Sequence, residues 1–549
     1  MKFLENYIIL LIGISLSLAG FLPERIKVLL SDHHYADNID KTLSKYGIPF
    51  LCFLIVIGFY LRFNNLGHLN FWIDELYTIY AAIGIIQQGA PVFPSGVFYD
   101  RSILNTYLIA LSFKIFGINE SSARIVSVVF STLTIPLVYL MGARIANRRV
   151  GILAALIMTI SVWEIVWARE ARMYAQFQFL YLLTAYLFYL GLTEKDMKIL
   201  FFSLIAFIGA VLSHEFAMTF LPVALIYILL SKKELFKNKY FLYRGLAIFG
   251  LVSILIVLKG KDILNKIISF QNVPLWGQRP FYYYALDSDL RILFFLVLLG
   301  ITVSVIMWKP GNKSQNSYLL LNFFIPFFIL SAYSWKESRY SLYIFPFLVL
   351  SASYAIDMYL LRDVIDKDAI DRLSRKFKIK KEFMRNIKFA FLFLIVILLF
   401  VQIYSSKGAF SFSQKDHGDI YGGIQHSNWK KGSEYISYRL LEDDKIMTTL
   451  PAAVLYYLRQ PDYYIKQIEY DYIENDKGQL VDAYTGRAII LNSYDSFIQA
   501  VNSNKGWVIV DYKIERYYTD QRVREYIRNN MTFHPDGSDD TIEVYSWNN

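Results

Sequence analysis

The stretch 199–212 reads ILFFSLIAFIGAVL and carries no charged residue. Comparable runs at 290–308 and 389–403 contain one charge or none. A bilayer accepts such segments more readily than water does. Across the 549 residues 55% are hydrophobic, more than in an ordinary soluble domain, and the mean hydropathy is +0.35. These observations predict a polytopic membrane protein, and they exclude a soluble globular enzyme, a disordered chain and a collagen-like fibre.

Thirteen apolar segments are candidates for membrane crossing, and each needs ~20 residues to span the bilayer. Because the shortest fall below that length, we expect about 12–13 transmembrane helices in a mainly α fold. The first segment lacks the basic start and cleavage site of a signal peptide, so we interpret it as a membrane anchor. The segments are 6–22, 48–63, 103–117, 122–142, 150–166, 173–191, 199–213, 216–231, 244–258, 290–308, 317–333, 340–360 and 389–404.

Lysine and arginine in short loops set the orientation, and they account for much of the net charge of +10. This charge indicates membrane topology, and we expect no nucleic-acid partner. The basic loops 143–149, 232–244 and 361–388 are predicted to be cytoplasmic. Because successive loops alternate between the two sides of the membrane, residues 64–102 and everything after 405 are predicted on the outer face. This assignment needs an odd number of crossings between 64–102 and 143–149, but two candidates lie there. Either one of them is not a simple span or loop 143–149 is misassigned.

The composition changes at about residue 405, where hydropathy falls and short β-rich runs alternate with helical ones. We predict an extracytoplasmic α/β domain with a largely parallel sheet over 405–549. It has no glycine-rich phosphate loop, so no nucleotide is assigned to it. The remaining predicted domains are an N-terminal helix and linker over 1–47 and a catalytic membrane domain over 48–404. The only cysteine, Cys52, excludes an internal disulfide.

The most informative polar feature is the pair Asp74 and Glu75, flanked by aromatic residues in the first outer loop 64–102. A carboxylate at a membrane face can remove a proton from an incoming hydroxyl. The same pattern is also typical of an interfacial helix with an acidic residue near its N-terminus. Spacing does not decide between these two interpretations.

Four further clusters of ionisable residues lie at predicted membrane boundaries. Each also has a structural interpretation: an arginine reaching to lipid headgroups, a surface ion pair, or a polar turn between helices. The clusters are Tyr99-Asp100-Arg101; Arg169, Glu170, Arg172 and Tyr174; His214-Glu215; and Lys336, Arg339 and Tyr340.

Several loose motifs follow one another in an order that resembles the GT-C membrane glycosyltransferases of the protein O-mannosyltransferase and aminoarabinose-transferase kind. The resemblance covers about residues 48–404. The motifs are Asp74-Glu75, Gly89 to Pro94, Tyr99 to Arg101, Phe116 to Arg124, Ala168 to Ala175 and Arg339 to Pro346.

The resemblance implies transfer of a sugar, with inversion, from a dolichyl- or undecaprenyl-phosphate donor to an acceptor hydroxyl on the outer face of the cell membrane. It implies that Asp74 is the base, with Glu75 beside it, and that Arg101 and Arg339 hold the donor phosphate. Arg169 and Arg172 are further phosphate candidates, and the remaining residues of the four clusters are expected in the pocket. Because the leaving group is already a phosphate, the reaction needs no added acid. No ligand spacing requires a metal, although the crowded carboxylates are compatible with a divalent cation.

Two other classes stay open at this point. A polytopic transporter or flippase of lipid-linked sugars predicts ionisable residues near the middle of the membrane and related halves. A membrane-anchored scaffold would leave the motif clusters unexplained. The sequence does not name the sugar, and the acceptor stays open between protein, lipid and surface glycan.

Overall fold

The computed structural model describes residues 34–231, 313–333, 336–357, 426–467, 472–515 and 519–548. Four predicted apolar segments lie outside these residues: 6–22, 244–258, 290–308 and 389–404. The basic stretch 361–388 and the loop 232–244 also lie outside them. The described chain forms two compact units. The first takes up most of the apolar helices. The second comprises the described parts of Phe63–Val128, Arg169–Met173 and Gly408–Asn549.

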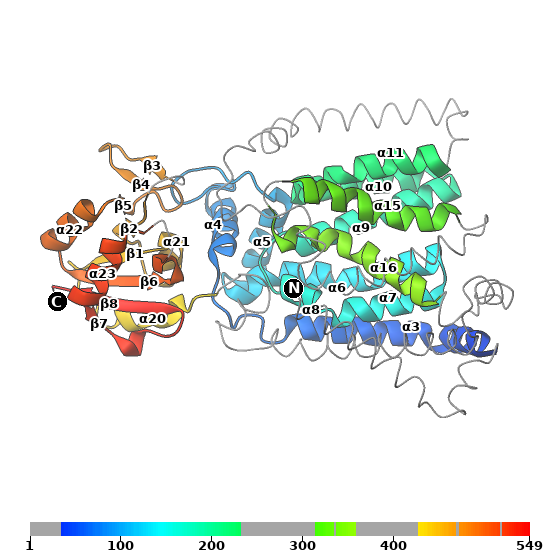
Figure 1. Cartoon of the computed structure of the whole chain (residues 1–549), viewed down its shortest axis with the longest axis horizontal. Helices are drawn as coiled ribbons and strands as arrows, with labels where there is room; N and C mark the ends of the chain where they lie inside the picture. Colours follow the sequence, from blue (N-terminus) through cyan, green and yellow to red (C-terminus); the bar gives the residue numbers. More distant parts are fainter. Residues whose placement is uncertain are drawn as a thin grey trace, which may run out of the picture. The chain divides into compact units, whose positions relative to one another are not determined.

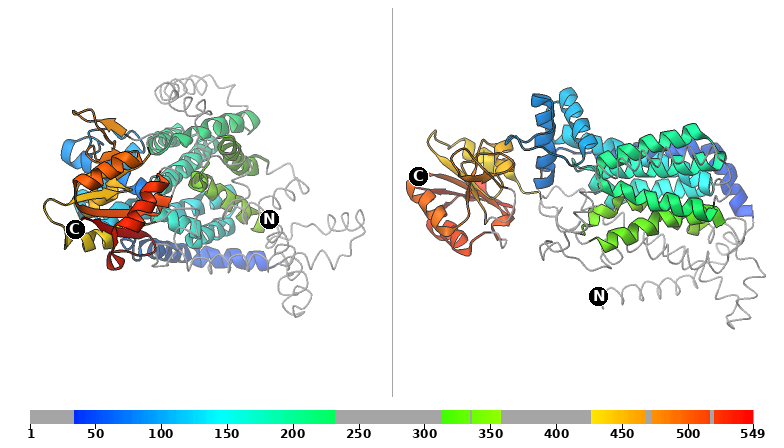
Figure 2. Two further views of the ribbon diagram at one scale, coloured as in Figure 1. Left: turned by 60° about the vertical axis from the view of Figure 1, so that its left-hand side comes forward. Right: turned by 90° about the horizontal axis from the view of Figure 1, so that it is seen from above.

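The first unit is helical throughout its described residues. Its central helices run side by side, with α9 packed along α10 and α11 along α15 (Figures 1 and 2). Gly191 permits the first of these contacts, because a Cβ there would lie 3.0 Å from the backbone nitrogen of Leu200. The elements are α3 His34–Phe63, α7 Arg148–Ile160, α8 Val162–Ala168, α9 Tyr174–Glu194, α10 Met197–Ser213, η1 Glu215–Thr219, α11 Phe220–Ser231, α15 Lys313–Ala332, η5 Ser338–Ile344 and α16 Phe345–Ile356.

Three described helices are long and apolar enough to cross a membrane: Thr42–Phe63, Glu120–Ile145 and Tyr174–Glu194. A fourth candidate is the pair α7 and α8, which is bent by 58°. The predicted segment 103–117 forms α5, Ile103–Phe116, which has 14 residues. At 1.5 Å per residue it is about 21 Å long, shorter than the hydrocarbon core. By length, α5 belongs to the shorter apolar helices of the described chain, and we interpret it as the candidate that is not a simple span.

A buried arginine holds the bend between α7 and α8. Arg62, in the last turn of α3, donates to the carbonyls of Met158 and Thr159 at the end of α7, and to Ser131. These bonds satisfy carbonyls that the helix end leaves open. Glu164 of α8 is also buried and accepts a hydrogen bond from Gln178. Both ionisable residues lie at helix ends or at the bend, and their bonds give them a structural role.

The second unit combines α4 Ile73–Gln88, α5, the first turns of α6 Glu120–Ile145 and the C-terminal domain. The domain has an eight-stranded sheet in the order β3-β4-β5-β2-β1-β6-β8-β7. The strands are β1 Lys445–Thr448, β2 Tyr463–Ile465, β3 Tyr472–Glu474, β4 Leu480–Asp482, β5 Ile489–Leu491, β6 Gly506–Asp511, β7 Thr532–Phe533 and β8 Ile542–Trp547. The first outer loop thus shares a compact unit with the C-terminal domain.

The sheet is mixed, so the prediction of a largely parallel sheet was wrong. Strands β5, β2, β1 and β6 are parallel, whereas β3, β4, β7 and β8 pair antiparallel. The short strands β2, β3, β4 and β7 have two or three residues each and too little apolar alternation to be recognised. The predicted strand 541–546 is β8, which pairs antiparallel with both β6 and β7.

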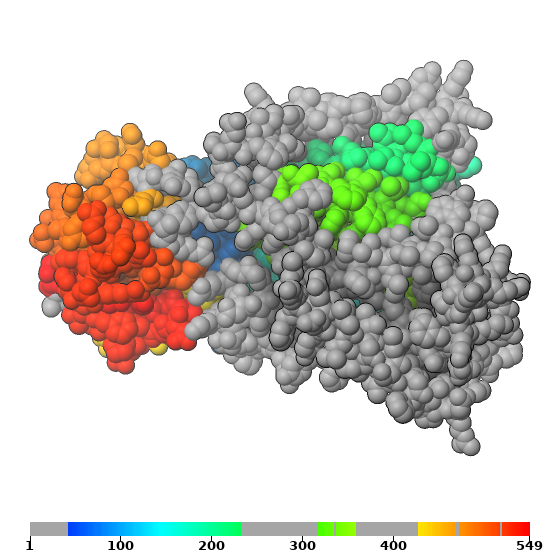
Figure 3. Space-filling model, in the orientation of Figure 1, coloured from blue at the N-terminus to red at the C-terminus, as the bar shows by residue number. Residues whose placement is uncertain are grey.

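Helices cover both faces of this sheet. On one face α22 Tyr494–Ser503 and α23 Gln521–Asn530 bury Phe497 and Ile527 against Val508 of β6. On the other face lies α20 Trp429–Ser437, where Gly432 allows close approach to Ile509. A short helix, α21 Pro451–Tyr457, follows β1. In the space-filling view the domain, coloured orange to red, presents a closed surface (Figure 3). The predicted α/β character of the domain is confirmed.

Candidate active site

The two adjacent carboxylates at the start of α4 have opposite environments. The Asp74 side chain keeps 27% of its exposure, whereas the Glu75 side chain keeps none. Successive residues on a helix point about 100° apart, so neighbouring side chains face different surroundings. The Glu75 carboxylate accepts a hydrogen bond from the backbone nitrogen of Trp72 at 3.3 Å and thereby caps the helix. Asp74 alone of the two is accessible to a substrate.

Glu75 forms a buried ion pair with Arg124 of α6. Arg124 Nε and Nη2 each donate to the carboxylate at 2.8 Å, and the backbone nitrogen of Ala171 donates at 2.7 Å. Arg124 also donates to the carbonyls of Leu66 and Leu69. Burial raises the pKa of Glu75, but the charge and hydrogen bonds of Arg124 outweigh it, so the pKa lies below its ordinary value. This pair ties α4, α6 and the loop before α4 together.

Asp74 lies beside Arg172. The distance from Arg172 Nη2 to Asp74 Oδ2 is 3.7 Å, and Nη1 donates to the Asp74 carbonyl at 2.8 Å. Nη1 also donates to Thr78 Oγ1 at 2.8 Å and to the Tyr99 hydroxyl oxygen at 3.4 Å. The arginine backbone is held in turn, because Ser127 donates to its carbonyl at 3.0 Å. A buried guanidinium is therefore fixed next to a partly exposed carboxylate.

Arg101 supplies a second positive charge near Asp74. Its side chain is exposed, and Asp100 before it is exposed as well. The burial of its remaining surface lowers the pKa of Arg101, but Tyr99, Asp74 and Tyr484 raise it above its ordinary value. The next residue, Ser102, has a left-handed backbone with φ of 46°. Such strain in a residue other than glycine is frequent at functional sites.

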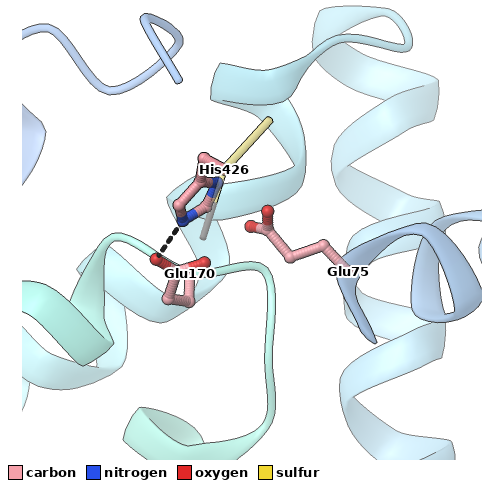
Figure 4. Close-up of side chains that lie close together, drawn as sticks. All are labelled: Glu75, Glu170 and His426. Carbon is pink, nitrogen blue, oxygen red and sulfur yellow. Dashed lines mark hydrogen bonds and ion pairs between the residues drawn. The ribbon is translucent and has the colours of Figure 1, made fainter. Parts of the chain in front are cut away.

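A histidine from the C-terminal domain joins this group. His426 Nε2 lies 3.1 Å from Glu170 Oε1, and Nδ1–H donates to the Asn70 carbonyl at 2.6 Å. Figure 4 shows Glu75 pointing from α4 toward this His426–Glu170 pair. Burial and the Glu75 charge raise the pKa of Glu170, and His426 only partly offsets them. Burial lowers the pKa of His426, but Glu170 and Glu75 together raise it above its ordinary value.

Glu75, Glu170 and His426 offer ligand atoms within 4.8 Å of one another, the spacing of a candidate cation site. Glu75 already accepts bonds from Arg124, Trp72 and Ala171, whereas Glu170 Oε2 has no hydrogen-bond partner among the described residues. When His426 is protonated, the positive charges of His426 and Arg124 balance the negative charges of Glu75 and Glu170. The residues could bind a cation, but a shared proton on the His426–Glu170 pair leaves the buried group neutral.

The structure gathers the other predicted site residues in the first unit. His214 stacks between Phe177 and Phe216, with ring centroids 5.2 and 4.8 Å away, and its Nδ1 lies 3.6 Å from Glu215. Tyr340 packs edge-on at 5.9 Å from the His214 ring and 6.4 Å from that of Tyr174.

Arg339 of η5 pairs with Glu337 at 3.7 Å, and the neighbouring Lys336 is buried. Arg169 belongs to the second unit and donates to the carbonyls of Asn64 and Asn65, so it holds the loop before α4.

Sequence reasoning missed His426, Thr78 and the structural role of Arg124. Arg124 stands inside one of the quoted motifs, which could have indicated it. His426 follows a long segment without any motif, and only the folded chain brings it to Glu170.

Comparisons with known proteins agree with this architecture. Residues 100–258 match the family described as dolichyl-phosphate-mannose-protein mannosyltransferase, and residues 265–419 match the Alg9-like mannosyltransferase family. The crystal structure of ArnT from Cupriavidus metallidurans in the apo state covers 92% of this chain and 98% of its own, with a TM-score of 0.58 and 11% identity. The chain has the GT-C glycosyltransferase fold.

Two further relatives extend the GT-C comparison. The archaeal oligosaccharyltransferase AglB from Archaeoglobus fulgidus matches 90% of the chain and 74% of its own length, with a TM-score of 0.52 and 14% identity. An uncharacterised protein of Aquifex aeolicus is 27% identical over 320 residues, which are 55% of this chain. The match spans 63% of that relative, less than two thirds of its length. The described apolar helices and the similarity in fold support a multi-pass membrane protein.

Proposed function

We propose that this protein transfers a sugar from a polyprenyl-phosphate-linked donor to an acceptor hydroxyl at the outer face of the membrane, with Asp74 as base. The observation that carries the proposal is the partly exposed Asp74 carboxylate, fixed 3.7 Å from Arg172 on a GT-C fold. Two similar structures support a polyprenyl donor. ArnT of Cupriavidus metallidurans binds undecaprenyl phosphate, and the AglB complex contains dolichol-phosphate.

In the proposed reaction the acceptor oxygen attacks the anomeric carbon of the donor sugar while its proton passes to Asp74. A new glycosidic C–O bond forms, and the C–O bond to phosphate breaks on the opposite side. The configuration is therefore inverted, and polyprenyl phosphate leaves with the bonding electron pair. A positioned carboxylate is suited to this step because general-base catalysis needs only hydrogen-bond reach to the hydroxyl.

The leaving phosphate gains negative charge as the bond breaks, and fixed cations stabilise that charge. Arg172 is held by Asp74, Thr78 and Tyr99, so its position costs no reorganisation during the reaction. Arg101 is exposed and able to reach an incoming phosphate. We assign phosphate binding to these two arginines. Arg339 stays a proposed phosphate ligand.

The test is a transfer assay in liposomes with radiolabelled hexose and pentose donors on undecaprenyl and dolichyl phosphate. It compares the wild type with Asp74→Asn and with the matched control Asp476→Asn, an exposed aspartate of the C-terminal domain. We expect Asp74→Asn to lower transfer by about 10²–10⁴-fold, the usual contribution of a general base, and Asp476→Asn to retain it.

Retained transfer in Asp74→Asn would remove the proposed base. A wild type that moves lipid-linked sugars across the liposome membrane without transferring them would instead support the flippase alternative.

A further inference from the structure

A tight turn of the C-terminal domain, Asp482 to Gly486, is held rigid by its own hydrogen bonds. The buried Asp482 carboxylate accepts from the backbone nitrogens of Tyr484 at 3.0 Å and Thr485 at 2.8 Å, and from the Thr485 hydroxyl. Gly486 ends the turn with φ of 73°, a conformation that favours glycine. Because the turn is preorganised, it presents the Tyr484 side chain in one direction.

This turn lies directly against the first outer loop. The Ser95 backbone nitrogen donates to the Tyr484 carbonyl at 3.2 Å, and Ser95 Oγ donates to the Ala483 carbonyl at 2.5 Å. A Cβ on Gly486 would lie 2.8 Å from the Cα of Ser95, so the close approach requires glycine. Two segments almost 400 residues apart in sequence are thus joined through their backbones.

The Tyr484 ring continues toward the proposed base. It stacks on Tyr77 with centroids 3.9 Å apart and planes 17° apart, and it packs edge-on against Phe93 at 5.2 Å. Tyr77 stands one helical turn after Asp74, so the two residues share a face of α4. Phe93 packs against Tyr99 at 5.5 Å, and the Tyr99 hydroxyl accepts from Arg172.

We propose that Tyr484 is a positioning residue of the donor-phosphate site, through which the C-terminal domain fixes Tyr77 on the Asp74 face of α4 and the Tyr99 hydroxyl beside Arg172. This inference rests on the proposed function and gives the C-terminal domain a part in it. The ligand chemistry is a polyprenyl phosphate monoester or diester. Tyr484 acts on Arg172 through the aromatic group Tyr77, Phe93 and Tyr99. No step of the reaction passes through its hydroxyl.

The experiment measures the binding of undecaprenyl phosphate and the kinetics of transfer for the full chain in nanodiscs. The variants are Tyr484→Ala, Tyr484→Phe and Ser95→Ala, with Tyr472→Ala as a control at an exposed tyrosine of the same domain. We expect Tyr484→Ala to weaken phosphate binding and raise KM for the donor by about tenfold, the effect of one lost contact of 1.4 kcal/mol. The kcat should change less than KM.

The conservative variant distinguishes positioning from folding. Tyr484→Phe keeps the stacking and should restore most of the donor KM, and Arg172→Lys combined with Tyr484→Ala should lose less than the sum of the single losses. If Tyr484→Ala does not fold, Ser95→Ala tests the same contact, and it should raise KM in the same direction.

The failure of this inference can be separated from failure of the proposed function. If the wild type binds and turns over the donor, and the Tyr484 and Ser95 variants have the same binding and kinetic constants as the wild type, the inference alone is overturned. A wild type that neither binds undecaprenyl phosphate nor transfers a sugar would overturn both.

Discussion

The Glu75 carboxylate accepts two hydrogen bonds of 2.8 Å from the Arg124 guanidinium, in a pair from which water is excluded. The residue before it, Asp74, is partly exposed and lies near a different arginine. Two adjacent acidic residues thereby acquire separate tasks. Glu75 joins α4 to α6, and we propose that Asp74 faces the substrate. The geometry supports a structural role for Glu75 and the proposed catalytic role for Asp74.

The first prediction separates these two carboxylates. Glu75→Gln leaves the Arg124 charge buried without its partner, so we expect a loss of about 3–5 kcal/mol in stability. Asp74→Asn should unfold at the wild-type temperature, because Asp74 makes only a partly exposed pair. Thermal unfolding in detergent measures both. A Glu75→Gln variant with wild-type unfolding temperature but no transfer would make Glu75 a catalytic group.

The second prediction concerns Arg172. Its guanidinium contacts Asp74, Thr78 and Tyr99 at once, and a lysine ammonium cannot reproduce that geometry. We expect Arg172→Lys to lower kcat by about 10–100-fold through lost charge stabilisation of the leaving phosphate. Steady-state transfer assays measure it, with Arg522→Lys at the surface of the C-terminal domain as control. Wild-type kcat in Arg172→Lys would show that only the positive charge is needed.

The third prediction is a pH dependence of stability. The pKa values of His426 and Glu170 lie above their ordinary values of 6.5 and 4.5, so both groups bind protons more tightly in the folded state. Their contribution to the free energy of unfolding is complete at pH values below the pKa values of the unfolded state. It is lost as the pH rises through the pKa values of the folded state. We expect the unfolding temperature to fall as the pH is raised above about 6.5.

Two variants test the origin of this pH effect. His426→Gln should flatten the curve of unfolding temperature against pH, and His68→Gln, at an exposed histidine, should leave the curve as in the wild type. An unchanged slope in His426→Gln would show that the His426–Glu170 pair does not share a proton.

The fourth prediction concerns a cation at Glu75, Glu170 and His426. Since protonated His426 and Arg124 balance the two carboxylates, we expect no stoichiometric metal in the purified protein and no change in unfolding temperature with EDTA. Elemental analysis and calorimetry with and without added Zn²⁺ or Mn²⁺ measure this. A stoichiometric metal that His426→Gln releases would assign the group to metal binding instead.

The membrane character and the positions of the described apolar helices could be predicted from local sequence alone. An uninterrupted apolar run such as 199–212 favours the hydrocarbon of a bilayer over water, and in a bilayer it forms a helix. Helix α10 covers this run. The strands β1, β5, β6 and β8 could likewise be predicted, because each is an apolar run with buried residues. The short strands β2, β3, β4 and β7 depend on pairing with their neighbours in the sheet, so no local pattern marks them.

The candidate site shows the same division. The motif pair Asp74-Glu75 indicated the position of the candidate site. Ionisable groups close to a membrane segment have a high free-energy cost and are usually functional. The sequence left the number of crossings open, and the 14-residue length of α5 favours the alternative in which this helix is not a simple span.

By itself, the sequence determined that this chain enters a membrane, where its acidic and basic clusters stand, and which glycosyltransferase superfamily they resemble. Only the tertiary structure decided which carboxylate is partly exposed, which arginine it faces, and that His426 and Tyr484 of the C-terminal domain reach residues 64–102. The physical reason is the separation in sequence between the groups that each interaction joins. Hydrophobic transfer acts on each segment separately, whereas hydrogen bonds and ring contacts require atoms that only folding brings together.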